Sequence, residues 1–146
     1  MGNAATIARE LRADLSKTIR DVMLLAADNV TNATPVDTGN AANNWVLSTG
    51  SPFAGVDGSR ESPSHVAQDE GIAKLQNYDV GRDGKVYLKN NVLYLQFLDA
   101  GHSQQADPGF VAAAFAGAAR RAQHGRKRAA AKMLRNMSRT AYLKTY

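Results

Sequence analysis

The sequence contains no cysteine among its 146 residues. This absence excludes disulfides, thiolate zinc sites and cysteine nucleophiles. No apolar run approaches the roughly 18 residues of a membrane-spanning helix, and residues 1–10 lack the apolar segment of a secretory signal. We therefore expect neither a membrane partner nor a signal peptide. Hydrophobic residues make up 44% of the chain and charged residues 21%, the balance of an ordinary single globular domain.

Acidic residues are missing from the last third of the chain, where nine basic residues follow Pro108. Residues 1–73 hold 5 basic and 9 acidic residues, a net charge of −4, whereas residues 74–146 hold 13 and 4, a net charge of +9. Such asymmetry indicates a face that meets either a polyanion such as DNA or an acidic protein partner, and both alternatives stay open. The residues expected on this face are Arg120, Arg121, Arg126, Lys127, Arg128 and Lys132.

A long amphipathic helix is predicted from about Ala4 to Thr34, ended by Pro35. At 1.5 Å per residue it would be about 45 Å long. Its single apolar stripe needs a cover, for which a neighbouring subunit is one candidate. The stripe consists of Ile7, Leu11, Leu15, Ile19 or Val22, Ala26 and Val30.

Turn-forming residues at 34–39 precede a short predicted strand, Asn43 to Thr49. A polar surface loop over residues 50–64 and a short helix over residues 63–77, with Ser64 as its cap, should follow. Alternating apolar residues then predict a β-hairpin made of residues 80–90 and 92–98. Its tight turn would be Asn90-Asn91, because asparagine tolerates left-handed backbone angles.

The C-terminal part is predicted to be helical after a second polar loop at residues 101–109. Asp107 and Pro108 resemble a helix start, with Asp107 as the cap. The many alanines after Phe110 would let this helix pack closely on the sheet, and Gly125 should kink or end it before a second helix over residues 126–140. We therefore expect one α+β domain, residues 1–125, with a small antiparallel sheet and helices packed on it, followed by a basic helical extension, residues 126–146.

Catalytic chemistry has no positive support in the sequence. Asp99, His102 and Ser103 are residue types of a hydrolytic triad, but they are neighbours in one loop, and no Gly-x-Ser-x-Gly turn is present. A surface loop is the favoured interpretation. The three histidines are isolated, which argues against a metal site, and no Gly-rich phosphate loop ends in Gly-Lys-Ser/Thr. We predict no enzyme activity, no cofactor and no metal.

Several short motifs occur in a particular order. Thr34–Gly39 (Thr-Pro-Val-Asp-Thr-Gly) follows the long helix and precedes Trp45. An Asn-x-x-Tyr strand motif ends at Tyr94, an acidic-x-Gly motif ends at Gly101, and Gln-Ala-Asp-Pro-Gly spans residues 105–109. In this order the motifs resemble the tail-completion and head–tail joining (neck) family of tailed bacteriophages, which typically has Gln-Ala-Pro-x-Gly in the last segment and a Glu where this chain has Asp99.

The resemblance implies a structural virion protein at the head–tail junction, assembled in the host bacterial cytoplasm as a ring, with six copies favoured. Its implied partners are an adjacent neck or portal-connector ring, tail tube or tail sheath proteins, and genomic DNA that passes through the channel without sequence recognition. The rival prediction is a small basic protein that binds duplex DNA non-specifically. The residues implied in contacts between rings are Thr34, Pro35, Asp37, Gly39, Gly101, His102, Gln105 and Pro108.

Overall fold

The computed structural model describes residues 3–60, 62 and 64–143, with side chains in the last helix described up to residue 128 and at residue 131. Helices dominate these residues, and a small sheet accompanies them, so the predicted α+β class is confirmed. The elements in chain order are α1 (Ala4–Ala33), α2 (Asn40–Asn43), β1 (Val46–Thr49), α3 (Val66–Gln76), α4 (Val80–Asp83), β2 (Val86–Lys89), α5 (Leu95–Asp99) and α6 (Phe110–Leu143).

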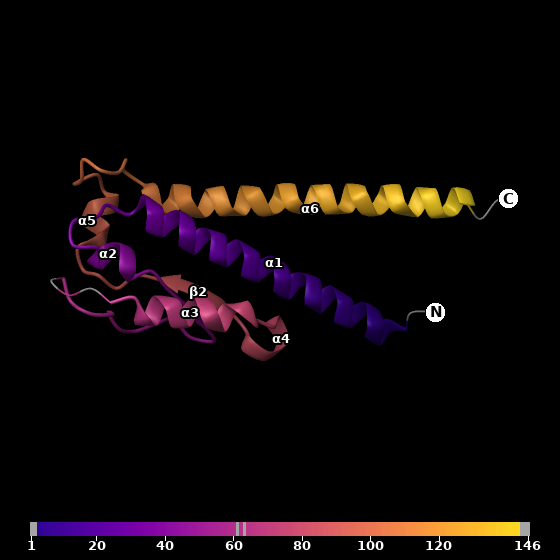
Figure 1. The fold of residues 1–146 in the computed structure, drawn as a ribbon, viewed down its shortest axis with the longest axis horizontal. Helices are drawn as coiled ribbons and strands as arrows, with labels where there is room; N and C mark the ends of the chain where they lie inside the picture. Colours follow the sequence, from indigo (N-terminus) through magenta and orange to yellow (C-terminus); the bar gives the residue numbers. More distant parts are fainter. Residues whose placement is uncertain (1–2, 61, 63, 144–146) are drawn as a thin grey trace.

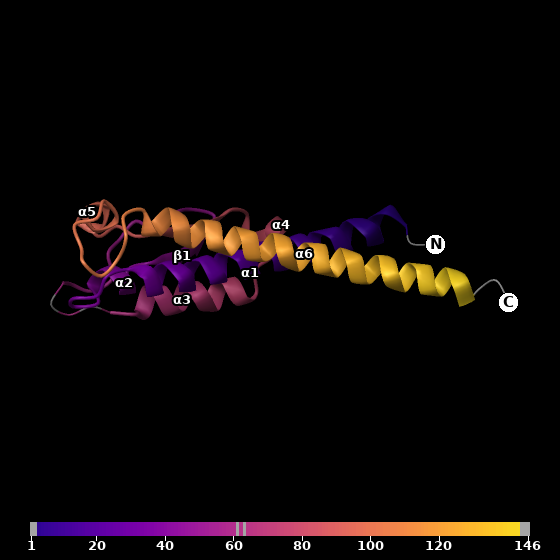
Figure 2. The same cartoon turned by 90° about the horizontal axis from the view of Figure 1, so that it is seen from above.

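Helix α1 forms the middle layer of an elongated molecule (Figure 1). Helix α6 packs along one side of α1, and the sheet, α3 and α4 pack on the other. The tips of α1 and α6 lie at one end of the molecule, whereas α2, α5 and the long loops lie at the opposite end (Figures 1 and 2). The predicted long N-terminal helix is confirmed. Asn3 caps its start, because the side-chain oxygen of Asn3 accepts a hydrogen bond from the Thr6 backbone N–H.

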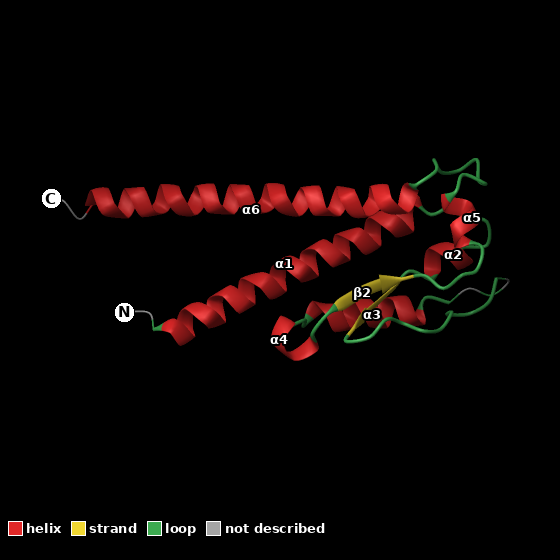
Figure 3. Ribbon diagram, turned by 180° about the vertical axis from the view of Figure 1, so that it is seen from behind, coloured by secondary structure: helices red, strands yellow, loops and turns green. Residues whose placement is uncertain are grey.

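The sheet consists of β1 and β2, which pair antiparallel with Leu47 opposite Leu88 (Figure 3). The predicted hairpin is therefore wrong, although its residues 86–89 do form a strand. Residues 80–83 are helix α4 and residues 95–99 are helix α5. The first strand's partner is thus distant in sequence, and the alternation at residues 93–97 was mistaken for a second strand.

Asparagine side chains explain why no tight turn forms at Asn90-Asn91. Asn90 donates a hydrogen bond to the Ala41 carbonyl at 2.7 Å. Asn91 donates to the carbonyls of Phe53 and Gly55 at 2.9 and 2.8 Å. These bonds hold the residues after β2 against α2 and the 50–64 loop. The chain then enters α5, where Leu95 and Leu98 pack inward at helical spacing.

The core has two apolar clusters, both of which include residues of α1. The first joins Ala27 to Leu47, Leu75 and Tyr78, and the second joins Val30 to Trp45, Phe110 and Ala114. Gly71 lets α3 approach β1 closely, because a Cβ at this position would lie 2.3 Å from the Leu47 carbonyl oxygen. The packing of α3 on the sheet therefore depends on the absence of a side chain at Gly71.

Helix α6 differs from its prediction in three ways. It packs mainly along α1 rather than on the sheet. Asp107 does not cap it; Asp99 accepts a hydrogen bond from the Val111 backbone N–H at 3.0 Å through its carboxylate. The helix also runs uninterrupted through Gly125, where a Cβ would meet nothing within 4 Å. The expected kink or break at Gly125 is therefore absent.

Candidate functional site

The two motif-bearing loop segments, residues 34–39 and 101–109, fold against each other at the end of the molecule that carries the long loops. The Val36 backbone N–H donates a hydrogen bond to the Gln105 side-chain oxygen at 2.9 Å, although the two residues are 69 positions apart. Between the segments lies a hollow of about 170 Å3. The surroundings include Pro35, Asp37 and Gly39 from the first segment and His102 and Gln105 from the second.

Thr34 has an internal role rather than an exposed one. Its side chain is 3% exposed and Trp45 is 4% exposed. The Thr34 hydroxyl donates to the Val30 carbonyl at 2.6 Å and accepts from the Trp45 indole N–H at 2.8 Å. This pair explains why a threonine at the end of α1 and a tryptophan eleven residues later occur together: the threonine accepts the only hydrogen bond that the buried indole can donate.

Asn44 fixes the 50–64 loop to the body of the protein. This fully buried side chain donates to the carbonyls of Asn40 and Asp57 at 2.8 and 3.2 Å, and its oxygen accepts from the Asp57 backbone N–H at 2.6 Å. The Asp57 carboxylate in turn accepts from the Ala67 backbone N–H at 2.6 Å at the start of α3. Ser64 also contributes, accepting from the Val66 backbone N–H. The loop is thereby held at its middle, through Asp57, and at its C-terminal end.

Two residues that the sequence analysis missed border the hollow, Asn40 and Arg60. The Arg60 guanidinium lies 5.7 Å from the centre of the Tyr94 ring and 3.6 Å from the Asp37 carboxylate. Asn40 donates to the Tyr94 hydroxyl at 3.2 Å. In the sequence, Tyr94 belongs only to the Asn-x-x-Tyr motif, and no local pattern connects it to Arg60, 34 residues earlier.

Among the other predicted contact residues, Gly101 and Pro108 lie close together. Gly101 has a left-handed φ of 95°, and a Cβ there would lie 2.8 Å from the Pro108 ring. Both residues are exposed, as are Asp37, His102 and Gln105. The hollow is therefore bordered by exposed polar side chains together with the exposed apolar side chain of Val36.

Asp99, His102 and Ser103 do not form a catalytic arrangement among the described hydrogen bonds. Asp99 caps α6, and the Ser103 hydroxyl accepts from the Gln105 backbone N–H at 3.1 Å. The His102 ring stands edge-on to Phe97, with ring centres 6.2 Å apart. Each side chain therefore has a separate structural contact.

Metal ligands do not gather anywhere within the part of the chain that the structure describes: no group of three or more His, Asp or Glu side chains is placed to hold an ion. In the same residues, no helix combines the length and the apolarity needed to cross a lipid bilayer.

The basic residues predicted to meet DNA or an acidic partner lie along α6. Arg120, Arg121, Arg126, Lys127 and Arg128 are all exposed. Lys132 also lies in α6, but its side chain is outside the described residues. Because the helix continues unbroken past residue 125, these residues extend along one rod away from the loop end (Figure 1).

No protein-family model, curated protein or solved structure matches the chain. The geometry of its own residues therefore carries the functional interpretation.

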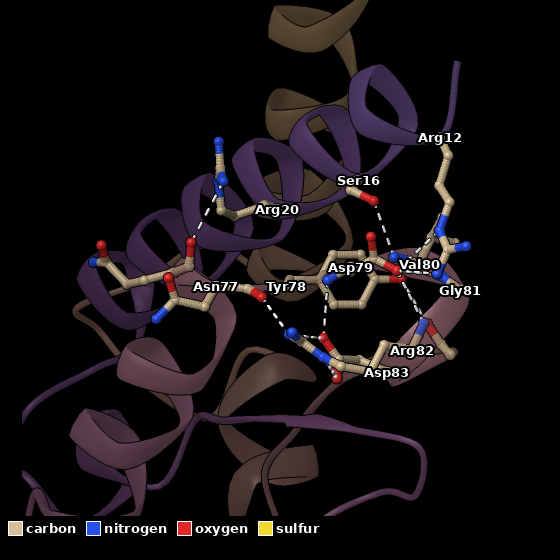
Figure 4. A network of polar contacts seen from close by, with 12 residues as sticks. Arg12, Ser16, Arg20, Asn77, Tyr78, Asp79, Val80, Gly81, Arg82 and Asp83 are labelled. Carbon is tan, nitrogen blue, oxygen red and sulfur yellow. Dashed lines mark hydrogen bonds and ion pairs between the residues drawn. The ribbon is translucent and has the colours of Figure 1, made fainter. Parts of the chain in front are cut away.

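A second polar cluster joins α1 to α4 (Figure 4). Arg12 donates to the Asp79 carboxylate at 3.0 and 2.6 Å, and the Ser16 hydroxyl accepts from the Val80 backbone N–H at 2.9 Å. The hydrogen bond from Arg12 holds the pKa of Asp79 below its ordinary value. The bonds from the Arg82 guanidinium, and next the bond from the Asp79 backbone N–H, lower the pKa of the Asp83 carboxyl to about 2. This cluster fastens α4 to the middle helix.

Acid should weaken the hydrogen bonds that the Asp83 carboxylate accepts from Arg82 and from the Asp79 backbone N–H, and should do so in a defined window. Because the folded pKa of Asp83 lies below the ordinary 3.8, its contribution to stability is full above that value and is lost as the pH falls towards about 2. We expect Asp83→Asn to flatten the decline in urea midpoint across this window. Asp69→Asn, which removes an exposed carboxylate of α3 outside the cluster, is the control. Parallel curves for Asp83→Asn and the wild type would contradict the expectation.

Proposed function

We propose that the chain is a structural subunit of the neck of a tailed phage, forming an oligomeric ring that joins the head connector to the tail as a tail-completion or tail-terminator protein. The ring would have six copies, would sit at the head–tail junction of the virion and would assemble in the host cytoplasm. One face would receive a neck or portal-connector ring, and the other the tail tube or sheath. DNA would pass through the channel without being read.

The observation that carries the proposal is the meeting of the two motif segments at one end of the molecule. Residues 34–39 and 101–109 are far apart in sequence, yet Val36 and Gln105 are hydrogen-bonded across the hollow. Exposed loops gathered at one end and fixed by buried anchors such as Asn44 suit a surface that docks against another protein ring. The long helices at the opposite end leave surface for side-to-side contacts.

The exposed basic residues of α6 favour one rival function. Arg120, Arg121, Arg126, Lys127 and Arg128 could neutralise phosphates of duplex DNA without reading its sequence. A protein with this function would lose about 10³–10⁵ in affinity between 50 and 200 mM salt if it made 6–10 phosphate contacts. A neck subunit should show only weak binding.

Two measurements on the full chain separate these functions. Negative-stain electron microscopy with native mass spectrometry should reveal closed rings of one defined copy number. Fluorescence anisotropy with a short duplex should give weak binding with a shallow salt slope. Tight duplex binding with a steep slope, lost when Arg126, Lys127 and Arg128 are replaced by glutamine, together with an absence of rings, would overturn the neck proposal in favour of the DNA-binding one.

A further inference from the structure

The N-terminal half of α1 carries an apolar face that the rest of the chain leaves open. Ile7, Leu11 and Leu15 are 52%, 65% and 44% exposed. They follow one another at four-residue steps, so they form one stripe along the helix. We call these three residues the open stripe. Exposed apolar stripes of this kind mark surfaces that bind another protein.

The open stripe exists because α1 and α6 diverge. They lie together near the loop end and separate towards the two chain termini, as seen from the front and from behind (Figures 1 and 3). A cleft of about 830 Å3 lies between them, with Asp14, Leu15 and Asp21 of α1 on one side and Arg121, Gly125 and Arg126 of α6 on the other. The chain's own α6 therefore faces Leu15 across the cleft and leaves Ile7 and Leu11 beyond it.

Acidic residues border the open stripe on one side. Glu10, Asp14 and Asp21 recur at steps of four and seven residues and so lie in a row along α1, which we call the acidic row. Asp21 is paired with Lys17, but neither Glu10 nor Asp14 takes part in an ion pair within the described residues. Arg12 is turned away, towards Asp79. The acidic row thus has two carboxylates without an ion pair in the described residues: Asp14, which lines the cleft, and Glu10, which lies outside it.

The basic segment of α6, residues 120–128, has the opposite character. Its five basic side chains are exposed, and none is in an ion pair within the described residues. Ala122 and Gly125 lie between them and line the cleft toward the chain's own α1, so a second helix that enters this cleft can approach their backbone closely. The basic segment therefore complements the acidic row and the open stripe together.

We propose that the basic segment of α6 from a second copy of this chain packs on the open stripe and the acidic row of α1. The inference rests on the proposed ring function and assigns its subunit contact. The other two pairings are disfavoured by charge, because α1 against α1 would bring two acidic rows together and α6 against α6 two basic segments.

The contact uses a different patch on each subunit and is therefore heterologous. A heterologous contact repeats from copy to copy and closes into a ring when its rotation closes. Each subunit would give its basic segment to one neighbour and its acidic row to the other. The net charge is −4 over residues 1–73 and +9 over residues 74–146. In this contact, an acidic surface from the first part of one copy meets a basic surface from the second part of another.

Charge reversal on either side tests the contact. The acidic-row variant carries Glu10→Lys with Asp14→Lys, and the basic-segment variant carries Arg121→Glu with Arg126→Glu. We expect each variant alone to lose the assembled species in sedimentation velocity and native mass spectrometry. An equimolar mixture of the two should reassemble when the variants alternate. The acidic α6 of the basic-segment variant then packs on the basic α1 of the acidic-row variant. The basic α6 of the acidic-row variant packs on the acidic α1 of the basic-segment variant. Only a contact between chains can be rescued by mixing.

A matched control reverses two exposed acidic residues on α3, with Asp69→Lys and Glu70→Lys, and changes the net charge by as much as the acidic-row variant. It should assemble as the wild type does. Far-UV circular dichroism checks that every variant is folded.

The possible results separate this contact from the proposed function. Assembly of both variants alone, failure of the mixture to reassemble, or a wild type that stays monomeric at every concentration would each overturn the contact. Loss of DNA binding in the basic-segment variant with unchanged assembly would overturn it as well, in favour of DNA at this helix.

If the mixture rescues assembly but microscopy shows open filaments or dimers, the contact stands and the neck function fails. If rings persist in both variants, the neck function stands without this contact.

Discussion

Gly71→Ala should destabilise the protein by about 1–3 kcal/mol, the usual cost of forcing an extra group into a well-packed core. The new Cβ would lie 2.3 Å from the Leu47 carbonyl oxygen and 3.1 Å from its carbon, so β1 and α3 must move apart. Neither side of the contact can yield by rotating a side chain, because both are backbone. Urea unfolding followed by the fluorescence of the single tryptophan, Trp45, measures the loss.

Gly125→Ala is the matched control for this prediction. Gly125 lies inside α6, and a Cβ there meets nothing within 4 Å. The same substitution should therefore stabilise the helix by up to about 1 kcal/mol, because alanine has the higher helix propensity. A Gly71→Ala variant as stable as Gly125→Ala would mean that α3 does not rest directly on β1.

Thr34→Val should cost about 1–3 kcal/mol, although the two side chains have nearly the same shape. Valine removes the oxygen that accepts from the Trp45 indole N–H at 2.8 Å and leaves a donor buried without a partner. Equilibrium unfolding in urea gives the free energy, and the emission maximum of Trp45 reports the change around its ring.

Thr34→Ser separates the hydrogen bond from the packing of the methyl group. Serine keeps the hydroxyl and loses one buried carbon, which costs about 0.8 kcal/mol. We expect the serine variant to be the more stable of the two. If the valine variant were equally stable or more so, the bond to Trp45 would contribute little, and the co-occurrence of the two residues would need another cause.

Local signals in the sequence predicted the longer helices α1 and α3 well, but missed the short helices α2, α4 and α5 and the pairing of the sheet. The period of Ile7, Leu11 and Leu15 marked α1, and Pro35 marked its end within one residue of Ala33. The strand pairing depends on Leu47 meeting Leu88 across 41 positions, which no local pattern records. The alternation at residues 93–97 fitted a strand equally well until the bonds made by Asn90 and Asn91 redirected the chain.

The sequence predicted the two loop segments of the candidate site but not the contact between them. The turn at residues 34–39 and the loop at residues 101–109 were both predicted, because glycine, proline and aspartate signal turns locally. Their contact through Val36 and Gln105 was not, nor was the internal role of Thr34. Arg60 stands in a loop of ordinary composition, so only the fold brings it over Tyr94. The capping of α6 by Asp99 rather than Asp107 likewise depends on tertiary structure.

The middle position of α1 has a consequence for the order in which the protein is made. Synthesis proceeds from the N-terminus, so α1 leaves the ribosome before every element that packs on it. Its bond from Asn29 to the Ala114 carbonyl joins residues 85 positions apart, and the second cluster cannot close before Phe110 has been added. Native contacts this distant in sequence slow folding. The nascent chain therefore displays an amphipathic α1 for most of translation, and an emerging neighbour or a chaperone can reach that helix before α6 does.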